Sequence, residues 1–121
     1  MNGITLALIF VGGGIGSVLR FIIGLPFKQW SVSLPVGTLL ANISAAIIIA
    51  FTLALANKSN VSPRTLFFLT TGLCGGLSTF STFSWETVQL FQQQQFGWAV
   101  INIVITNLAC IGLIAGISTL K

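Results

Sequence analysis

The sequence predicts an all-α membrane protein with four transmembrane helices, and its composition, its length and its pattern of apolar runs each support this fold class. Apolar residue types make up 55% of the 121 residues, charged types make up 5%, and the mean hydropathy is +1.02. A hydrocarbon core about 30 Å thick takes about 20 apolar residues per helix, so this length suffices for about four crossings. We therefore expect residues 1–121 to form a single transmembrane domain.

Four apolar runs follow one another along the chain, and we expect spans over residues 3–25, 36–56, 65–91 and 98–120. The breaks between them are "PFKQWSVSLP", "NKSNVSPR" and "QQQQFG", which carry the proline, asparagine, serine and glycine typical of turns. The first run has no basic residue before it and no small-residue cleavage site, so we expect it to remain as a span and not to act as a signal peptide.

Small residues recur at a spacing of four in the first, second and fourth spans. In lipid, such pairs let helix backbones approach closely, so we expect these positions to be packing contacts. The pairs are Gly12 and Gly16, Ala41 and Ala45, and Gly112 and Gly116. A phosphate-loop interpretation of "GGGIG" is excluded, because the Lys and the strand-to-helix context of such loops are absent.

The second span contains an amide in its first half. Asn42 lies one turn after Thr38, and a polar side chain at membrane depth is costly unless it faces a partner or a wet cavity. An amide has four hydrogen-bonding sites that helix packing alone rarely satisfies, so we expect Asn42 to have a functional role. Interhelical hydrogen bonding is the alternative.

The third span carries the most unusual stretch, "TTGLCGGLSTFSTFSWE", over residues 70–86. Gly75 and Gly76 weaken a helix, and the hydroxyls that follow compete for backbone hydrogen bonds, so we expect a break near Gly75 to Thr79. A broken helix is tolerated at membrane depth where the freed backbone is buried in protein or lines a cavity. Exposed carbonyls there would suit a hard cation such as Na⁺.

Two phenylalanines follow the expected break, at a spacing that places them on one helix face. Phe80 and Phe83 are surrounded by Ser81, Thr82 and Ser84 and not by the aliphatic residues of a core. A phenyl ring is electropositive at its edge, so rings presented edge-on can line an anion path without binding the anion tightly. Packing in a core is the alternative for such a pair.

The fourth span carries a polar stripe at a spacing of four, formed by Asn102, Thr106 and Cys110, with Asn107 beside it. These donors, like Asn42, could replace the water lost by an anion. Glu86, the only acid of the chain, has two interpretations: it pairs structurally with a basic residue such as Arg20 or Arg64, or it takes up and releases protons.

The basic residues are almost balanced between the two expected membrane sides. Lys58, Arg64 and Lys121 fall on one side, and Lys28 and Arg20 on the other. This weak bias permits insertion in both orientations, and so an antiparallel homodimer; a single orientation or a different partner subunit is the alternative. The scattered charges form no nucleic-acid surface. An enzyme is disfavoured, because the chain has no His and no pair of acids.

The stretches "GGGIGSVLR", "GTLLAN" and above all "GGLSTFSTFSWE" resemble the Fluc (CrcB-type) fluoride channels of bacteria, and the resemblance covers nearly the whole chain. It implies a passive, fluoride-selective channel in the bacterial cell membrane, which exports cytoplasmic fluoride through two pores of an antiparallel dimer. It also implies a structural Na⁺ ion at the centre of that dimer.

By resemblance, Asn42 is the pore-facing amide and the carbonyls of Gly75 and Ser78 hold Na⁺. The implied fluoride pathway consists of Thr38, Asn42, Phe80, Ser81, Thr82, Phe83, Asn102 and Thr106. Arg20 and Glu86 match charged positions of the family, with the role of the acid left open. The chain departs from the family at Cys110 and Ile114, where hydroxyls often continue the polar stripe.

A rival interpretation is a small dual-topology exporter of organic cations, which is also a four-span dimer. Such an exporter exchanges protons for substrate on a carboxylate deep in its cavity. The single acid, Glu86, lies late in the third span, and no acid occupies the first. Proton coupling predicts loss of transport on Glu86→Gln, whereas a pore predicts loss on substitution of Phe80, Phe83 or Asn42.

Overall fold

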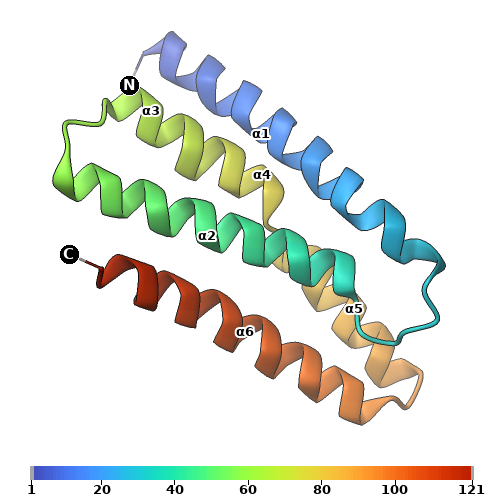
Figure 1. Cartoon of the computed structure of the whole chain (residues 1–121). Helices are drawn as coiled ribbons and strands as arrows, with labels where there is room; N and C mark the ends of the chain where they lie inside the picture. Colours follow the sequence, from blue (N-terminus) through green and yellow to red (C-terminus); the bar gives the residue numbers. More distant parts are fainter. Residues whose placement is uncertain (1, 121) are drawn as a thin grey trace.

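The computed structural model describes residues 2–120, which form helices and connecting turns. Four helical rods lie side by side and are joined at alternating ends, so that the first rod begins on the side where the last one ends (Figure 1). The four rods are Gly3–Gln29, Val36–Lys58, Pro63–Gln92 and Phe96–Ser118, and each is long and apolar enough to cross a membrane. The structure is therefore that of a multi-pass membrane protein, with rods that overlap the four runs expected from the sequence.

The first, second and fourth rods are simple helices. The first is α1 (Gly3–Gly24), which continues into the short 3₁₀ helix η1 (Leu25–Gln29) where Pro26 stands. The second is α2 (Val36–Lys58), and the fourth is α6 (Phe96–Ser118). Asn2 caps α1, because its side chain accepts a hydrogen bond from the Thr5 N–H at 3.1 Å.

The third rod is built from four helical pieces. These are α3 (Pro63–Phe67), the π-helical segment η2 (Phe68–Cys74), α4 (Gly75–Leu77) and α5 (Phe80–Gln92). Between α4 and α5 the backbone is extended, with ψ 156° at Ser78 and φ −153° at Thr79. The break expected near Gly75–Thr79 is therefore present, at its C-terminal end, and α5 leaves it displaced from α4 (Figure 1).

The N-terminal half of the third rod packs closely on α1, which contacts η2 and α4. A Cβ added to Gly12 would lie 2.8 Å from the Phe68 carbonyl oxygen, and one added to Gly16 would collide with the carbonyl of Leu73. Glycine is thus required for this backbone contact. On α2, Ala41 and Ala45 are buried in the same core as Leu77.

The packing expected at Gly112 and Gly116 is wrong for the single chain. A Cβ added to either residue meets no atom within 4 Å. The reason is that this face of α6 is not covered by another helix among residues 2–120, although α6 packs on α2 along another face.

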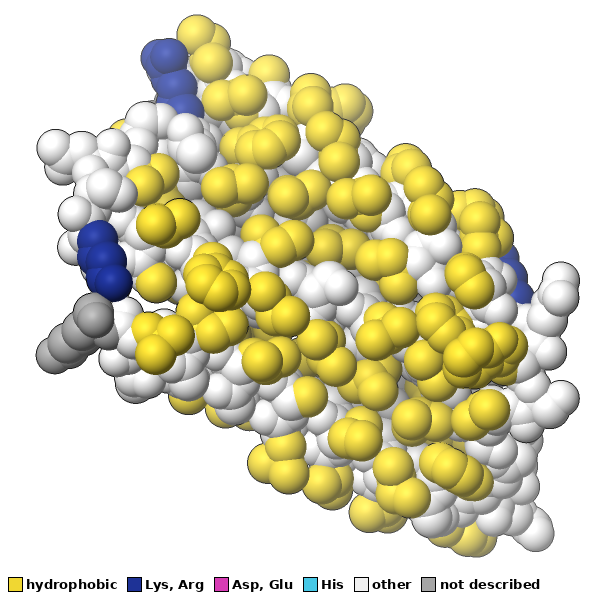
Figure 2. Space-filling model, viewed as in Figure 1, with side chains coloured by type: hydrophobic (Ala, Val, Ile, Leu, Met, Phe, Trp, Pro, Cys, Tyr) yellow, Lys and Arg dark blue, Asp and Glu magenta, His cyan; other side chains and the backbone are white. Residues whose placement is uncertain are grey.

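The surface matches a lipid environment. Figure 2 shows hydrophobic side chains spread over the middle of the molecule, with Lys and Arg side chains near its two ends. Large apolar residues stay highly exposed in the single chain, among them Phe10 at 83% and Phe80 at 79%. In water such exposure would be unfavourable, whereas lipid or a second protein subunit can cover it.

Candidate functional site

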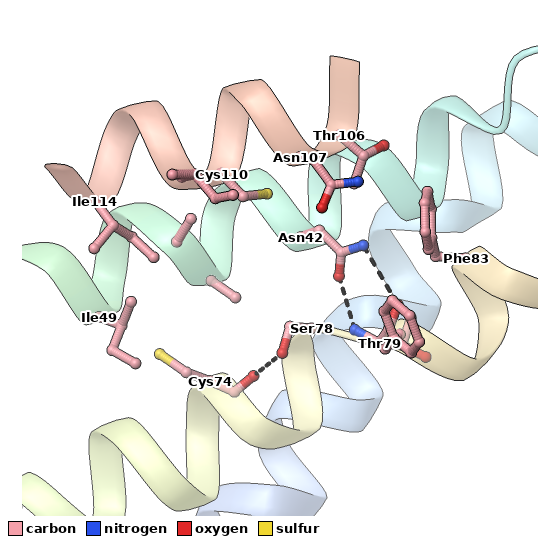
Figure 3. Close-up of a pocket in the computed structure, with 14 residues that line it drawn as sticks. Asn42, Ile49, Cys74, Ser78, Thr79, Phe83, Thr106, Asn107, Cys110 and Ile114 are labelled. Atoms are coloured by element: carbon pink, nitrogen blue, oxygen red, sulfur yellow. Dashed lines mark hydrogen bonds between the residues drawn. The ribbon is translucent and has the colours of Figure 1, made fainter. Parts of the chain in front are cut away.

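A hollow of about 310 Å³ lies between α2, α6 and the broken part of the third rod (Figure 3). We call it the main hollow, because both phenyl rings and the break line it. Its polar lining comes from three elements: Asn42 from α2, Ser78 and Thr79 from the break, and Thr106 and Asn107 from α6. Phe80 and Phe83 line it from α5. The hollow thus brings together four residues of the expected fluoride pathway, Asn42, Phe80, Phe83 and Thr106.

Asn42 holds the break by two hydrogen bonds (Figure 3). The Thr79 N–H donates to Asn42 Oδ1 at 2.7 Å, and Asn42 Nδ2 donates to the Thr79 carbonyl at 3.4 Å. In a continuous helix that N–H would donate to the carbonyl of Gly75. The amide therefore replaces the helical partner that the break removes, while it also faces the hollow.

The two phenyl rings lie together but in unlike surroundings. Their centroids are 5.7 Å apart and their planes are inclined by 41°. Phe83 is 7% exposed, whereas Phe80 is 79% exposed. Only Phe83 is thus enclosed by its own chain, and the hollow stays open on the side of Phe80.

The hydroxyls after the break form a small cluster around Thr79. Its side chain caps α5 by accepting from the Thr82 N–H at 3.1 Å, and its hydroxyl donates to Thr82 Oγ1 at 3.1 Å. The Ser81 hydroxyl is 3.3 Å from that of Thr79. Ser81 itself is exposed and does not line the hollow.

A second hollow, of about 420 Å³, lies at the end of the bundle where α1 meets α2. Thr38 and Thr82 line it together with Arg20 and Lys28. The Lys28 ammonium is held 4.7 Å from the centre of the Phe21 ring, a cation–π contact. This region is the more positively charged of the two hollows, and Thr82 joins it to the hydroxyl cluster at the break.

Glu86 does not form the expected ion pair with Arg20 or Arg64. Its Oε1 accepts a hydrogen bond from the Thr38 hydroxyl at 2.8 Å, and its Oε2 is buried without a hydrogen-bond partner among residues 2–120. Arg64 starts the third rod while Glu86 is near its end, which excludes their contact. The structure instead places the acid against Thr38 on α2.

The polar stripe of α6 divides into two kinds of residue. Thr106 lines the hollow, whereas Asn102 does not and is 1% exposed. Asn102 Nδ2 donates to the Thr87 hydroxyl at 2.9 Å. Thr87 was not singled out by sequence, because a lone Thr in an apolar helix is ordinarily a packing residue. Beyond Thr106 the lining is Cys110 and Ile114, so the polar track ends there.

Backbone oxygens at the break could hold a hard cation. The helix end leaves the last carbonyls of α4 without their helical partners, and the Thr79 N–H turns to Asn42 and not to Gly75. Gly75 is exposed and lines a further hollow between α1 and the third rod, whereas Ser78 lines the main one. Among residues 2–120 no cluster of three His, Cys, Asp or Glu residues suits a metal.

The chain is similar in sequence to one protein family and to several named proteins. The model of one family, described as "CrcB-like protein, Camphor Resistance (CrcB)", matches residues 7–117. Proteins named "Fluoride-specific ion channel FluC" from Salmonella arizonae, Salmonella paratyphi B and Salmonella newport are each 43% identical over 108 residues. Those residues cover 88% of this chain and 85% of each relative.

Proposed function

The chain belongs to the CrcB-like family, and from this premise we propose that it is a passive, fluoride-selective ion channel that exports cytoplasmic fluoride. The relatives are named fluoride-specific channels, and the structure supplies a membrane bundle with a polar hollow. The proposal locates the channel in the cell membrane of a bacterium, where it relieves fluoride toxicity.

The observation that carries the proposal is the lining of the main hollow. It combines two phenyl rings with neutral hydrogen-bond donors, and none of its lining residues is charged. A conducting site must bind an ion strongly enough to replace its water and weakly enough to release it. Hydroxyl and amide donors beside ring edges meet that requirement for a small anion, whereas Lys or Arg at the same place would hold it.

The proposed pathway joins the two hollows. Arg20 and Lys28 attract the anion to the second hollow, where the Thr82 hydroxyl can donate to it. Thr38 lines the same hollow, but its hydroxyl donates to Glu86. Phe80, Phe83, Asn42 and Thr106 then take the anion through the main hollow. Ser81, which is exposed beside Thr79, would add a hydroxyl at the open side of the pathway.

We further propose that the working unit is a homodimer of two inverted copies with two pores. The open side of the hollow at Phe80 and the exposed Gly75 leave the site incomplete in one chain. A second copy in the opposite orientation would cover both, and the nearly balanced basic residues allow that orientation. The carbonyls of Gly75 and Ser78 from the two copies would hold a structural Na⁺ at the centre of the dimer, because the negative oxygen ends of these carbonyls stabilise a cation.

Export through such a pore needs no energy source other than the electrochemical gradient of fluoride. Hydrogen fluoride enters cells as a neutral acid and dissociates inside, and the negative membrane potential drives the anion out. The pore residues of this chain only have to replace the water shell of fluoride and exclude larger anions.

The test is fluoride release from liposomes that contain only this purified protein, followed with a fluoride electrode after a K⁺ ionophore is added. We expect rapid fluoride release and no chloride release in a parallel sample. Absence of fluoride release from folded protein would contradict the proposal for this chain acting alone.

A further inference from the structure

A chain of buried hydrogen bonds lies directly behind the wall of the main hollow and ties α6 to α5. The Thr106 hydroxyl donates to Asn102 Oδ1 at 3.4 Å, and Asn102 Nδ2 donates to the Thr87 hydroxyl at 2.9 Å. The Thr87 hydroxyl donates in turn to the Phe83 carbonyl at 2.7 Å. This series of hydrogen bonds thus connects two residues that line the hollow, Thr106 and Phe83.

The two residues in the middle of this hydrogen-bond series, Asn102 and Thr87, have no contact with the hollow. Asn102 is 1% exposed and Thr87 is 6% exposed, and neither lines it. One hydroxyl can donate once and accept twice, so Thr87 donates to Phe83 and accepts from Asn102 without conflict. At membrane depth such groups have no water to bond, so each depends on the others.

We propose that Asn102 and Thr87 are positioning residues, which hold Phe83 and the Thr106 hydroxyl in the places from which they face the ion path. This inference rests on the proposed channel function. It replaces the expectation that Asn102 contacts fluoride, because a residue sealed behind the wall acts through its partners. Thr87 fixes the helical turn that carries the Phe83 ring. Asn102 accepts a hydrogen bond from the Thr106 hydroxyl at 3.4 Å, and so holds this side chain at the wall until the hydroxyl donates to a passing ion instead.

The alternative is that the pair serves stability alone, and paired substitutions separate the two roles. Removing one partner leaves a buried polar group unsatisfied, whereas replacing both by apolar groups of similar shape is nearly neutral for folding. The double variant T87V/N102L leaves only the Thr106 hydroxyl, which lines the hollow, without its partner. It should therefore fold well while it lacks the hydrogen bonds between α5 and α6. Positioning predicts low flux in this variant, and a role in stability alone predicts normal flux.

We would measure fluoride efflux per folded protein for T87V, N102L, the double variant and T87S. We expect flux about tenfold lower in T87V and N102L, the scale on which one buried hydrogen bond acts. The double variant should be equally low, and T87S, which keeps the hydroxyl, should conduct like the wild type. T52V is the matched control, since Thr52 is buried and donates to the Ile48 carbonyl at 2.7 Å but lines no hollow.

Normal flux in the double variant, or equal flux in T87V and T87S, would overturn the inference. A second measurement tests the positioning role without relying on fluoride flux. In it, 4-fluorophenylalanine is placed at position 83 and its ring is observed by ¹⁹F NMR. We expect one narrow resonance with Thr87 or T87S, and a broadened or split one with T87V and with T87V/N102L. An unchanged resonance in all four would refute the positioning role, whereas a wild type that releases no fluoride would refute only the channel proposal.

Discussion

Phe80 and Phe83 are three residues apart on α5, yet one ring is enclosed by its own chain and the other faces outwards. Both line the same hollow, with centroids 5.7 Å apart. Phe83 is buried within its own chain, at 7% exposure, and Phe80 depends on whatever covers the open side. The two rings therefore differ in what they contribute to folding, although the proposed path uses both.

Replacing either ring by isoleucine tests this residue-scale account. We expect F80I and F83I to form folded protein with strongly reduced fluoride flux, because an aliphatic side chain has no electropositive edge. F83I should lower the free energy of unfolding by roughly 1 kcal/mol, since it changes the shape of a buried side chain, and F80I should lower it less. F51I, at a 52% exposed position on α2 outside the hollows, is the control. Normal flux in both ring variants would remove the pair from the mechanism.

Asn42 combines a structural and a functional task. Its amide satisfies both backbone groups of Thr79, so N42A leaves a buried N–H without a partner, a cost of about 1–3 kcal/mol. We expect a lower melting temperature in detergent and reduced fluoride flux. N57A, in the exposed last turn of α2, should change neither; a stable, fully conducting N42A would contradict the role assigned to the amide.

From the sequence, residue chemistry alone singled out three side chains that the structure brings to one hollow. An amide at membrane depth marked Asn42, and a ring pair among hydroxyls marked Phe80 and Phe83, and all three line the hollow. The spacing of four in α6 could not show which members of the stripe face the hollow, so Asn102 was grouped with Thr106. Thr87 and the Thr38–Glu86 contact depend on how the helices pack, which a single sequence does not reveal.

At the scale of elements, the third rod is the part that departs from a simple helix. Gly75 and Gly76 lower helix propensity and the hydroxyls of Ser78 and Thr79 offer alternative bonds. Ser78 donates back to the Cys74 carbonyl at 2.8 Å and Thr79 caps α5. These local preferences made the break predictable, whereas the π-helical turns of η2 have no comparable local signal.

The contact between α1 and the third rod gives an element-scale prediction. In G16A the added methyl would meet the Leu73 carbonyl, and backbone cannot move aside as a side chain can. Overpacking of this kind costs roughly 1–3 kcal/mol, so we expect a lower melting temperature and less folded protein. G112A is the matched control, because nothing lies within 4 Å of its added methyl. Equal melting temperatures for the two variants would show that the contact is looser than described.

At the scale of the whole molecule, the weak charge bias and the open hollow point to the same assembly. Residues 2–120 leave Phe80 exposed and Gly75 uncovered, and α1 begins on the side of the bundle where α6 ends (Figure 1). An inverted copy would place its own break beside this one. Apart from its resemblance to a family of antiparallel dimers, the sequence indicated the proposed assembly through its loop charges alone, since one chain does not show the surface of its partner.

Adding positive charge to one loop tests whether two inverted copies of the chain form the channel. Q92K/Q93K adds positive charge to the third loop, and N57K/N60K adds it to the second loop, at the opposite end of the bundle, so each variant should insert in one orientation only. We expect either variant alone to give little fluoride flux and the two coexpressed to restore it. Full flux from one variant alone would contradict an antiparallel homodimer.

The reversal potential of single channels in a planar bilayer distinguishes a passive fluoride pore from a chloride pore and from a proton-coupled carrier. With a fluoride gradient across the bilayer, equal chloride on both sides and equal pH, a passive fluoride-selective pore must reverse at the Nernst potential of fluoride. Changing the pH on one side should leave that potential unchanged. A reversal potential that follows chloride, or one that moves with the proton gradient, would contradict the account.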